Sequence, residues 1–347
     1  MAPDEAHETR LAIVGSGQIA DSHLPAALAT RGLQVAALVD PSVERARALA
    51  EKWGVAPRIA PHLADVLGAV DAALVATPND AHAPVALECI AAGVPVLVEK
   101  PLASSLADAE RVVEAGERAG VTVAVGFSTR FQWNVRFMGE LLRAGQLGAP
   151  RRFAYQFGHP GGWSSYTGYH LDRRAVGGGV LVTTGTHFLD RMLDWFGYPA
   201  SVALEDDSLG GPEANALARF EFDGPGGRFP GSARFSRTVR LPGGIALETD
   251  LGIVTLREDP TSPVVLRRHD QPGISAELRP TGGAGDTARK SIFRLQLEDF
   301  AAALRDGRPP LVTGRAGLAS IRLVEALYAN RRELVSDPYH AHRPRAA

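Results

Sequence analysis

Apolar and polar residues between position 11 and about position 125 follow two alternating patterns. Short apolar runs are typical of buried strands, and the longer stretches between them place apolar residues at the helical spacing. The predicted strands are residues 11–14, 35–39, 72–76, 94–98 and 121–125, and the predicted helices are residues 18–30, 42–53, 82–92 and 106–119. Strands that alternate with helices in this way form a parallel sheet covered on both faces. The sequence therefore predicts an α/β fold for this part of the chain.

The pattern changes after Phe131. Glycine, proline and strand-like runs dominate residues 151 to about 268, and a glycine cluster followed by a helical pattern interrupts them at 177–196. The strand-like runs are residues 152–157, 216–222, 234–239, 245–249 and 253–256, and further helices are predicted at 134–142, 291–306 and 316–332. This second pattern predicts a larger, mainly antiparallel sheet with helices on one side.

Composition and charge narrow the class of protein. Hydrophobic residues make up 45% and charged residues 22% of the 347 positions, which is typical of a globular enzyme with two domains of about 150 residues each. The formal net charge of −2 gives no basic excess for binding nucleic acid, and no apolar run is long enough to span a membrane. The polar N-terminal segment lacks the apolar core of a secretory signal, so we expect a cytoplasmic protein.

The sequence lacks the usual metal and P-loop motifs. Cys89 is the only cysteine, which excludes an intrachain disulfide framework and a cysteine-based zinc cluster. The ten histidines form no cluster typical of a metal site, and neither H-E-x-x-H nor G-x-x-x-x-G-K-[ST] occurs. We therefore expect no metal centre and no P-loop nucleotide hydrolysis.

A glycine-rich turn joins the first predicted strand to the first predicted helix. The run Ile-Val-Gly-Ser-Gly-Gln-Ile-Ala matches G-x-G-x-x-G/A, with Ala20 in the third glycine position. Gly15 permits the tight turn, and Gly17 lets the backbone approach a pyrophosphate closely. The phosphates would lie at the helix N-terminus, beside Gln18 and Ile19. The alternative is an ordinary glycine turn, but the flanking strand and helix favour a dinucleotide site.

Asp40, at the end of the second predicted strand, indicates which dinucleotide binds. A carboxylate here can accept hydrogen bonds from the adenosine ribose 2′-hydroxyl and would repel a 2′-phosphate. Arg45 is the nearest cation in sequence and could turn toward such a phosphate. We expect NAD to be favoured over NADP. The alternative role for Asp40 is that of a helix-cap or turn residue.

Several further motifs occur in the order expected of one family. They are Thr77-Pro78-Asn79 with His82, Glu99-Lys100-Pro101 after the fourth strand, Gly126-Phe127-Ser128-Thr129-Arg130-Phe131, and the run from Gly177 to Asp190, which is similar to G-G-G-x-L-x-D-x-G-x-H-x-x-D. Together with residues 296–314 and the glycine-rich turn, they resemble the Gfo/Idh/MocA oxidoreductases. The resemblance extends over nearly the whole chain.

The resemblance implies two domains with the nicotinamide and the substrate between them. We expect a Rossmann dinucleotide-binding domain at 1–128 and a substrate-binding and oligomerisation domain with an open-faced mixed sheet at 129–347. The helices at about 291–332 can pack back toward the first domain. An exposed apolar sheet face is costly in water, so a homodimer or homotetramer is expected.

Lys100 and His187 are the expected catalytic residues. Lys100 follows a strand at the sheet edge where α/β proteins bind ligands, and its ammonium could hydrogen-bond the substrate oxygen. Partial burial would lower its pKa and help it exchange a proton. The resemblance implies that His187 faces the substrate and acts with an aspartate four residues earlier. The alternatives are a surface lysine and a packed histidine.

The position of that aspartate is occupied by Thr183, which departs from the family motif. Threonine cannot orient an imidazole by charge or raise its pKa, so the usual lysine–aspartate–histidine arrangement is in doubt. Thr183 remains a candidate substrate-binding residue. His187 would then bind substrate, act as an acid or base alone, or leave proton transfer to another group.

Other candidates surround the expected nicotinamide and substrate. Thr77, Asn79, His82 and Glu99 would approach the cofactor, with a helix-cap role as the alternative for His82. Arg130 would reach the substrate at the domain junction, with a plain interdomain salt bridge as the alternative.

The segment 161–170 combines aromatic and hydroxyl groups, which suits a sugar that stacks its CH face and hydrogen-bonds through its hydroxyls. Its candidate substrate-binding residues are Trp163, Tyr166, Tyr169 and His170. Either tyrosine could also donate a proton. The alternative is that these aromatic residues close one edge of the core.

These observations predict an NAD(P)-dependent oxidoreductase that interconverts a secondary alcohol and a ketone. The expected substrate is a sugar, sugar nucleotide, amino sugar or cyclitol, and ketone reduction would suit a site without the aspartate. One alternative is a glycoside hydrolase that uses NAD for a transient oxidation. Another is a cofactor-binding protein without catalytic activity.

Overall fold

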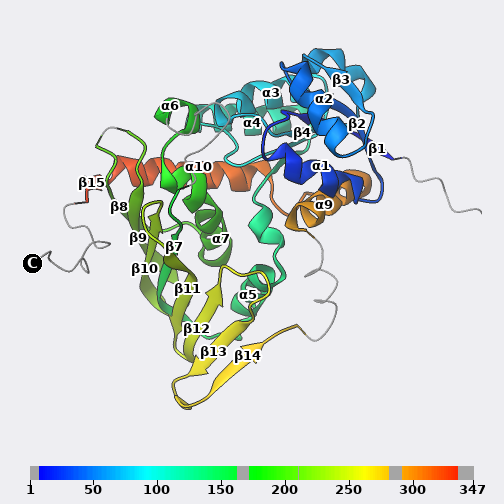
Figure 1. Cartoon of the computed structure of the whole chain (residues 1–347). Coiled ribbons are helices and arrows are strands. Elements are labelled where there is room, and N and C mark those ends of the chain that lie inside the picture. The colour runs from blue at the N-terminus through cyan, green and yellow to red at the C-terminus, as the bar shows by residue number, and fades with distance from the viewer. Residues whose placement is uncertain (1–7, 162–171, 210, 281–290, 335–347) are drawn as a thin grey trace, which may run out of the picture.

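The chain forms two sheets that lie one above the other in Figure 1. The computed structural model describes residues 8–161, 172–209, 211–280 and 291–334. The first sheet has the strand order β3-β2-β1-β4-β5-β6, and all its neighbouring strands are parallel. Its strands are β1 (Thr9–Val14), β2 (Leu33–Val39), β3 (Arg58–Ala60), β4 (Ala72–Val75), β5 (Val96–Val98) and β6 (Val123–Val125). The parallel α/β fold predicted from the apolar runs is confirmed.

Two of the four long helices of the first domain, α2 and α4, begin at serine caps that the sequence shows. The four are α1 (Ala20–Leu28), α2 (Val43–Lys52), α3 (Asn79–Ala91) and α4 (Leu106–Ala119), with the short helices η1 (Leu63–Asp65), η2 (Leu67–Ala69) and η3 (Ser128–Phe131). The Ser42 and Ser105 hydroxyls accept hydrogen bonds from the first turns of α2 and α4. Gly120 ends α4 in the left-handed conformation, with φ of 65°. The caps agree with the predicted bounds of α2 and α4, whereas α3, which has no side-chain cap, begins three residues before its predicted start at residue 82.

The second sheet has nine strands in the order β14-β13-β12-β11-β7-β10-β9-β8-β15. The β7–β10 and β8–β15 pairs are parallel and the other pairs are antiparallel. The strands are β7 (Pro150–Gly158), β8 (Ser201–Asp206), β9 (Asn215–Gly224), β10 (Gly227–Ser236), β11 (Leu241–Thr249), β12 (Gly252–Arg257), β13 (Val264–Arg268), β14 (Ser275–Leu278) and β15 (Arg331–Glu333). The predicted mixed, mainly antiparallel sheet is therefore confirmed.

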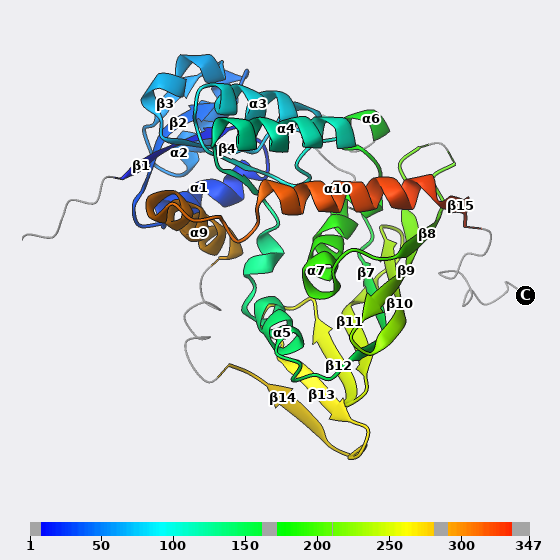
Figure 2. The ribbon, with the colours of Figure 1, turned by 180° about the vertical axis from the view of Figure 1, so that it is seen from behind.

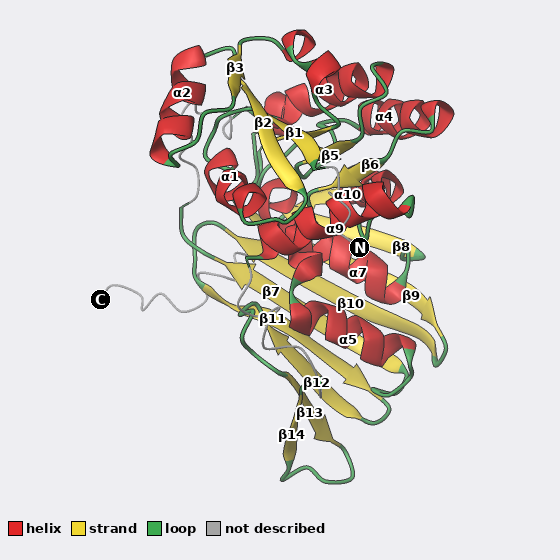
Figure 3. Cartoon of the chain, turned by 90° about the vertical axis from the view of Figure 1, so that its right-hand side faces the viewer, coloured by secondary structure: helices red, strands yellow, loops and turns green. Residues whose placement is uncertain are grey.

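One face of this sheet is covered by helices. They are α5 (Trp133–Arg143), α7 (Thr186–Phe196) and α10 (Gly314–Ala329), and Figure 3 shows α5 and α7 in front of the strands. An aromatic core fills the space between the layers: Phe188 of α7 stacks on Tyr155 of β7 with ring centroids 3.7 Å apart. Phe153 and Phe220 belong to the same buried cluster. This packing fixes α7 against the sheet.

The opposite face of the nine-stranded sheet is not a continuous apolar surface. A shallow hollow on it is lined in part by Arg152, Arg219, Glu221 and Glu248. Arg152 pairs with Glu248, and Arg219 pairs with Glu205. This face therefore combines paired charged side chains with apolar ones such as Ala154, Ala246 and Ile253. Oligomerisation stays a prediction that rests on the resemblance.

The last two helices return to the first domain. Helix α9 (Ile292–Asp306) packs against α1, and α10 packs against α4 on one side and α7 on the other. Val125 of β6 donates its N–H to the carbonyl of Val312, just before α10. In the view from behind, α10 lies across the boundary between the two sheets (Figure 2). The C-terminal helices thus join the two sheets.

Several short strands were not predicted. Residues Ser275–Leu278 of β14 are nearly all exposed, and β15 consists of Arg-Arg-Glu, so neither shows the apolar alternation of a strand. The predicted run 234–239 ends at Ser236, where β10 stops.

Among the described residues, no helix is long and apolar enough to cross a membrane.

The glycine cluster at 177–179 lets the chain pass close to a buried carboxylate. A Cβ on Gly179 would lie 2.2 Å from the carbonyl oxygen of Glu213. The Glu213 side chain accepts three hydrogen bonds, each at 2.9 Å. The donors are the N–H groups of Gly179 and Leu181 and the Tyr328 hydroxyl. Burial raises the pKa of Glu213, and these donors oppose the rise. Glu213 therefore holds the turn that leads into η5 (Leu181–Gly185), a π-helix, and α7.

We predict that Gly179→Ala lowers the free energy of unfolding by roughly 1–3 kcal/mol, because the new methyl group meets backbone atoms that cannot rotate away. Gly68→Ala is the matched control, since a Cβ on Gly68 meets no atom within 4 Å. Urea denaturation of both variants measures the difference. Equal stabilities of the two variants would contradict this explanation of the glycine cluster.

Candidate active site

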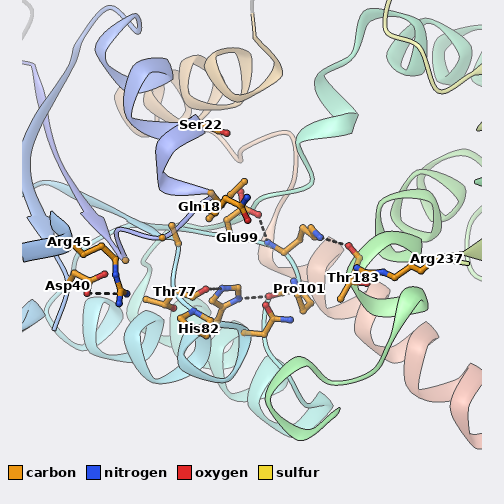
Figure 4. A pocket seen from close by; sticks show the side chains of 17 residues that line it. Gln18, Ser22, Asp40, Arg45, Thr77, His82, Glu99, Pro101, Thr183 and Arg237 are labelled. Carbon is orange, nitrogen blue, oxygen red and sulfur yellow. Dashed lines mark hydrogen bonds and ion pairs between the residues drawn. The ribbon is translucent and has the colours of Figure 1, made fainter. Parts of the chain in front are cut away.

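One cavity lies at the carboxyl ends of the first sheet's strands and extends to the start of α7 (Figure 4). All ten residues predicted to bind cofactor line it. They are Gly15, Gly17, Gln18, Ile19, Asp40, Thr77, Asn79, His82, Glu99 and Lys100. The other lining residues are Ser22, Arg45, Ala76, Pro78, Pro101, Thr183 and Arg237. The structure brings these residues together, and their roles toward a cofactor stay predictions.

The glycine-rich turn has the shape that a pyrophosphate needs. Gly15 has φ of +97°, and a Cβ there would lie 2.6 Å from the Ala76 carbonyl oxygen. A Cβ on Gly17 would meet no atom within 4 Å, so the backbone is open to the cavity at this position. The N–H groups of Gly17, Gln18 and Ile19 donate to no acceptor among the described residues. Free donors at a helix N-terminus suit an anion, so the turn fits a dinucleotide.

Asp40 is held rigidly at the far end of the cavity. Its side chain accepts hydrogen bonds from the backbone N–H groups of Ser16, at 2.8 Å, and Ser42, at 2.9 Å. Arg45 lies 3.6 Å away and is half-exposed. Asp40 thus has the turn-stabilising contacts that were the alternative interpretation, and it also lines the cavity.

A buried hydrogen-bond partner of Glu99 was not found from the sequence. Glu99 follows β5, and its Oε1 lies 2.6 Å from Nε2 of His23 on α1. The other oxygen accepts the backbone N–H of Lys100 at 3.0 Å. Burial raises the pKa of Glu99, but His23 and Lys100 together lower it below its ordinary value. A carboxylate therefore lies behind Lys100. The sole signal for His23 in the sequence is its position on the buried face of α1.

Lys100 reaches from the first domain to the second. Its Nζ donates a hydrogen bond to the backbone carbonyl of Thr183 at 2.8 Å. Burial lowers the pKa of Lys100, and the charge of Arg237 lowers it further, against the opposing effect of Glu99. The ammonium thus stands in the cavity with a pKa below the ordinary lysine value.

Thr183 also contacts a cation that sequence reasoning missed. Its hydroxyl donates to the Gly179 carbonyl at 2.8 Å and accepts from Nη2 of Arg237 at 2.6 Å. Arg237 directly follows β10 and lines the cavity. Its position at a strand end was the one available signal in the sequence.

His187 is not one of the described residues that line this cavity. Its ring lies edge-on to Phe127, with centroids 6.1 Å apart, and its buried Nδ1 has no hydrogen-bond partner among the described residues. Burial and the charges of Lys100 and Arg191 hold its pKa well below the ordinary value. The imidazole is therefore neutral at pH 7, and its catalytic role stays a prediction.

His82 and Asn79 form hydrogen bonds between separate segments that surround the cavity. The His82 ring lies between two carbonyl oxygens, that of Pro101 at 2.6 Å and that of Thr77 at 2.9 Å. Since these contacts join two loops and cap no helix, the helix-cap alternative for His82 is wrong. Burial lowers the pKa of His82, although both carbonyls oppose this effect. The Asn79 amide donates to the carbonyl of Val176, in helix α6 (Arg173–Val176), at 3.0 Å.

The structure places Arg130 in a buried salt bridge and not in the lining of the cavity. Its guanidinium donates two hydrogen bonds to Asp190 of α7, at 2.7 and 3.0 Å, and lies 2.7 Å from Asp194. This is the interdomain pairing weighed above as the alternative to substrate contact. Burial raises the pKa of Asp190, and Arg130 opposes that rise.

The aromatic candidates Trp163, Tyr166, Tyr169 and His170 lie outside the described residues. Within the part of the chain that is described, no group of three or more His, Cys, Asp or Glu side chains could hold a metal ion.

Comparison with known proteins gives the class of the chain. Residues 9–127 match the model described as an oxidoreductase family with an NAD-binding Rossmann fold, and residues 135–244 match the GFO/IDH/MocA C-terminal domain. The chain belongs to the Gfo/Idh/MocA oxidoreductase family.

Relatives and solved structures agree with this assignment over most of the chain. D-apiose dehydrogenase of Paraburkholderia graminis is 28% identical over 93% of this chain and 87% of its own length. 1,5-anhydro-D-fructose reductase of Ensifer adhaerens is 26% identical over 90% and 93%. The crystal structure of aldose–aldose oxidoreductase from Caulobacter crescentus, complexed with glycerol, has 25% identity and a TM-score of 0.81, and covers 93% of this chain and 97% of that one. The chain is therefore an oxidoreductase.

We predict that Arg130→Ala lowers the free energy of unfolding by about 3–5 kcal/mol, because it leaves the Asp190 carboxylate buried without its partner. Arg143→Ala is the control: its side chain is 56% exposed and lies 3.5 Å from Asp194, so its removal should cost about 1 kcal/mol or less. Chemical denaturation measures both. A small loss in both variants would show that Arg130 does not hold the domain junction.

Proposed function

We propose that this oxidoreductase interconverts a secondary alcohol and a ketone on a sugar or cyclitol, with NAD as the hydride carrier. The observation that carries the proposal is the placement of Lys100 Nζ in the same cavity as the open backbone of Gly17. Relatives named as a sugar dehydrogenase and a keto-sugar reductase support this substrate class.

Lys100 would bind the substrate oxygen and move the proton. When bound, the nicotinamide supplies or accepts the hydride. In the oxidation direction, neutral Nζ takes the hydroxyl proton. In the reduction direction, the ammonium stabilises the developing alkoxide and donates a proton to it. A lowered pKa makes both protonation states accessible nearer to neutral pH than for a solvated lysine.

The surroundings of Lys100 favour ketone reduction. The neutral His187 has a pKa well below its ordinary value, and Thr183 has no charge with which to make that imidazole a stronger base. The cation at Nζ can donate a proton without such help. Tyr166 or Tyr169 remains a further proposed donor.

We predict that Lys100→Ala reduces turnover by at least about 10²-fold, the low end for a positioned acid–base group, and leaves NAD binding largely intact. Turnover is followed by the absorbance of the reduced nicotinamide, a net signal that a hydrolase with transient oxidation would not give. Lys52→Ala is the control, since Lys52 is exposed and pairs with Asp21. Near-normal turnover in Lys100→Ala would remove Lys100 from the proposed mechanism.

The cofactor preference is proposed from the fixed position of Asp40. Two backbone donors hold its carboxylate in the cavity wall, so it cannot easily turn away from a 2′-phosphate. Arg45, the nearest cation, is already paired with Asp40. Both features favour a ribose with a free 2′-hydroxyl.

We predict that NADH binds more tightly than NADPH in calorimetric titrations. Asp40→Ala should narrow the difference, because it removes the charge repulsion. Tighter or equal binding of NADPH by the unaltered protein would defeat the NAD assignment.

A further inference from the structure

A buried histidine of helix α1 contacts the carboxylate that precedes Lys100. The His23 side chain is 0% exposed, and its Nε2 lies 2.6 Å from Oε1 of Glu99. The other ring nitrogen, Nδ1, has no hydrogen-bond partner in the part of the chain that the structure describes. The Phe293 ring of α9 packs edge-on against the imidazole, with centroids 4.8 Å apart. Among the described residues, Glu99 is thus the one side chain that hydrogen-bonds this imidazole.

Packing alone does not explain a histidine at this position. The other buried residues of α1 are apolar, namely Ala20, Leu24, Ala26 and Ala27. A buried ring nitrogen without a partner costs free energy that an apolar side chain would not cost. A polar residue kept at such a cost points to a role for the contact that it does make.

The Glu99 carboxylate is held in one orientation. His23 contacts Oε1, and the backbone N–H of Lys100 donates to Oε2 at 3.0 Å (Figure 4). Gly126 leaves the space that the carboxylate fills, because a Cβ on Gly126 would lie 3.0 Å from both Cδ and Oε2 of Glu99. The carboxylate is therefore fixed at the base of the residue proposed to move the proton.

These contacts decide whether the buried carboxyl group is charged. Burial raises the pKa of Glu99, but the hydrogen bond from His23 leads the effects that bring it below the ordinary value. Burial also lowers the pKa of Lys100; the charge of Glu99 opposes this effect, and the charge of Arg237 adds to it. Loss of the His23 contact would favour a neutral Glu99, and Lys100 would then lose the charge that stabilises its ammonium form.

Two other titratable side chains interact with this pair. Glu99 and Lys100 both act on His82 of α3, and Lys100 acts on His187 of α7. Burial lowers the pKa of both imidazoles, so they are neutral at pH 7. A neutral imidazole places no net charge beside Lys100. Among the described residues, Glu99 and Arg237 are therefore the charged groups that set its affinity for a proton.

We propose that His23 is a positioning residue for Lys100: its hydrogen bond holds the Glu99 carboxylate, charged and oriented, beside the lysine. His23 is not one of the described residues that line the cavity, so it acts through Glu99. Lys100 then stays an ammonium up to a higher pH than burial alone would allow, which keeps it able to donate a proton in ketone reduction. This inference rests on the proposed function, because it names a residue that acts through the proposed acid–base group.

Competitive labelling with acetic anhydride measures the proton affinity of Lys100 without requiring turnover. The reagent attacks only the neutral amine, so the extent of labelling against pH gives a midpoint for each lysine. The sequence has three lysines, Lys52, Lys100 and Lys290, and mass spectrometry of the labelled peptides distinguishes them. Lys52, which is exposed and pairs with Asp21, is the internal reference in every sample of the whole chain.

A matched pair of variants isolates the hydrogen bond. His23→Leu has no donor, so the Lys100 midpoint should fall by about one pH unit or more, the effect of losing a nearby opposite charge. His23→Gln retains an N–H donor, and its midpoint should stay nearer to that of the unaltered protein than to that of His23→Leu. The Lys52 midpoint should be the same in all three proteins.

A Glu99→Gln background distinguishes action through Glu99 from a general structural effect. Glu99→Gln keeps the shape of the side chain and removes its charge, so it should lower the Lys100 midpoint about as far as His23→Leu does. His23→Leu added to Glu99→Gln should then cause no further fall. If His23→Leu does not fold, His23→Asn takes its place, because its shorter amide does not reach the position of Nε2.

The outcomes separate this inference from the proposed function. An unchanged Lys100 midpoint in His23→Leu or in Glu99→Gln, an equal fall in His23→Gln and His23→Leu, or a further fall in the double variant would overturn the role of His23. The expected midpoints in a protein that turns over no sugar or cyclitol would support that role and contradict the proposed function. Turnover of a sugar together with an unchanged midpoint in His23→Leu would do the reverse.

Discussion

The hydrogen bond from the Lys100 ammonium to the Thr183 carbonyl is the interaction on which the site depends. It joins the end of β5 in the first domain to the π-helix that precedes α7 in the second. Burial of an ammonium is unfavourable unless dipoles or opposite charges compensate it. Here the Thr183 carbonyl supplies a dipole, and Glu99 supplies a negative charge behind the lysine. The catalytic candidate is thus held between two domains that must remain in register.

Three buried carboxylates maintain that register. Glu99 contacts His23 under the glycine-rich turn, Glu213 accepts the N–H groups at the start of the π-helix, and Asp190 pairs with Arg130 at the domain junction. Each binds donors from a different chain segment, so each replaces lost hydration by specific contacts. The result is a rigid frame around the lysine, which suits a reaction that needs accurate placement of two reactants.

Local patterns made much of this frame predictable. The apolar runs of β1, β2, β4, β5 and β6 gave the parallel sheet, and the glycine-rich turn, Asp40 and Lys100 follow strands, so the topology alone places them at one edge. Contacts between residues far apart in the sequence could not be predicted from local patterns. His23 and Arg237 carry no motif, and the pairing of Arg130 with Asp190 spans 60 positions. The polar strand β15 forms because it pairs with β8, and its own sequence shows no strand pattern.

The central claim is that Lys100 carries the proton with a pKa below the ordinary lysine value. Its most direct test is the pH dependence of single-turnover alcohol oxidation, followed by nicotinamide absorbance in the unaltered enzyme and in Lys100→Met. Oxidation needs the neutral amine, so the rate should rise with pH through an inflection below the ordinary lysine pKa. That inflection should vanish in Lys100→Met. The same inflection in both proteins would contradict the claim, because the titrating group would then lie elsewhere.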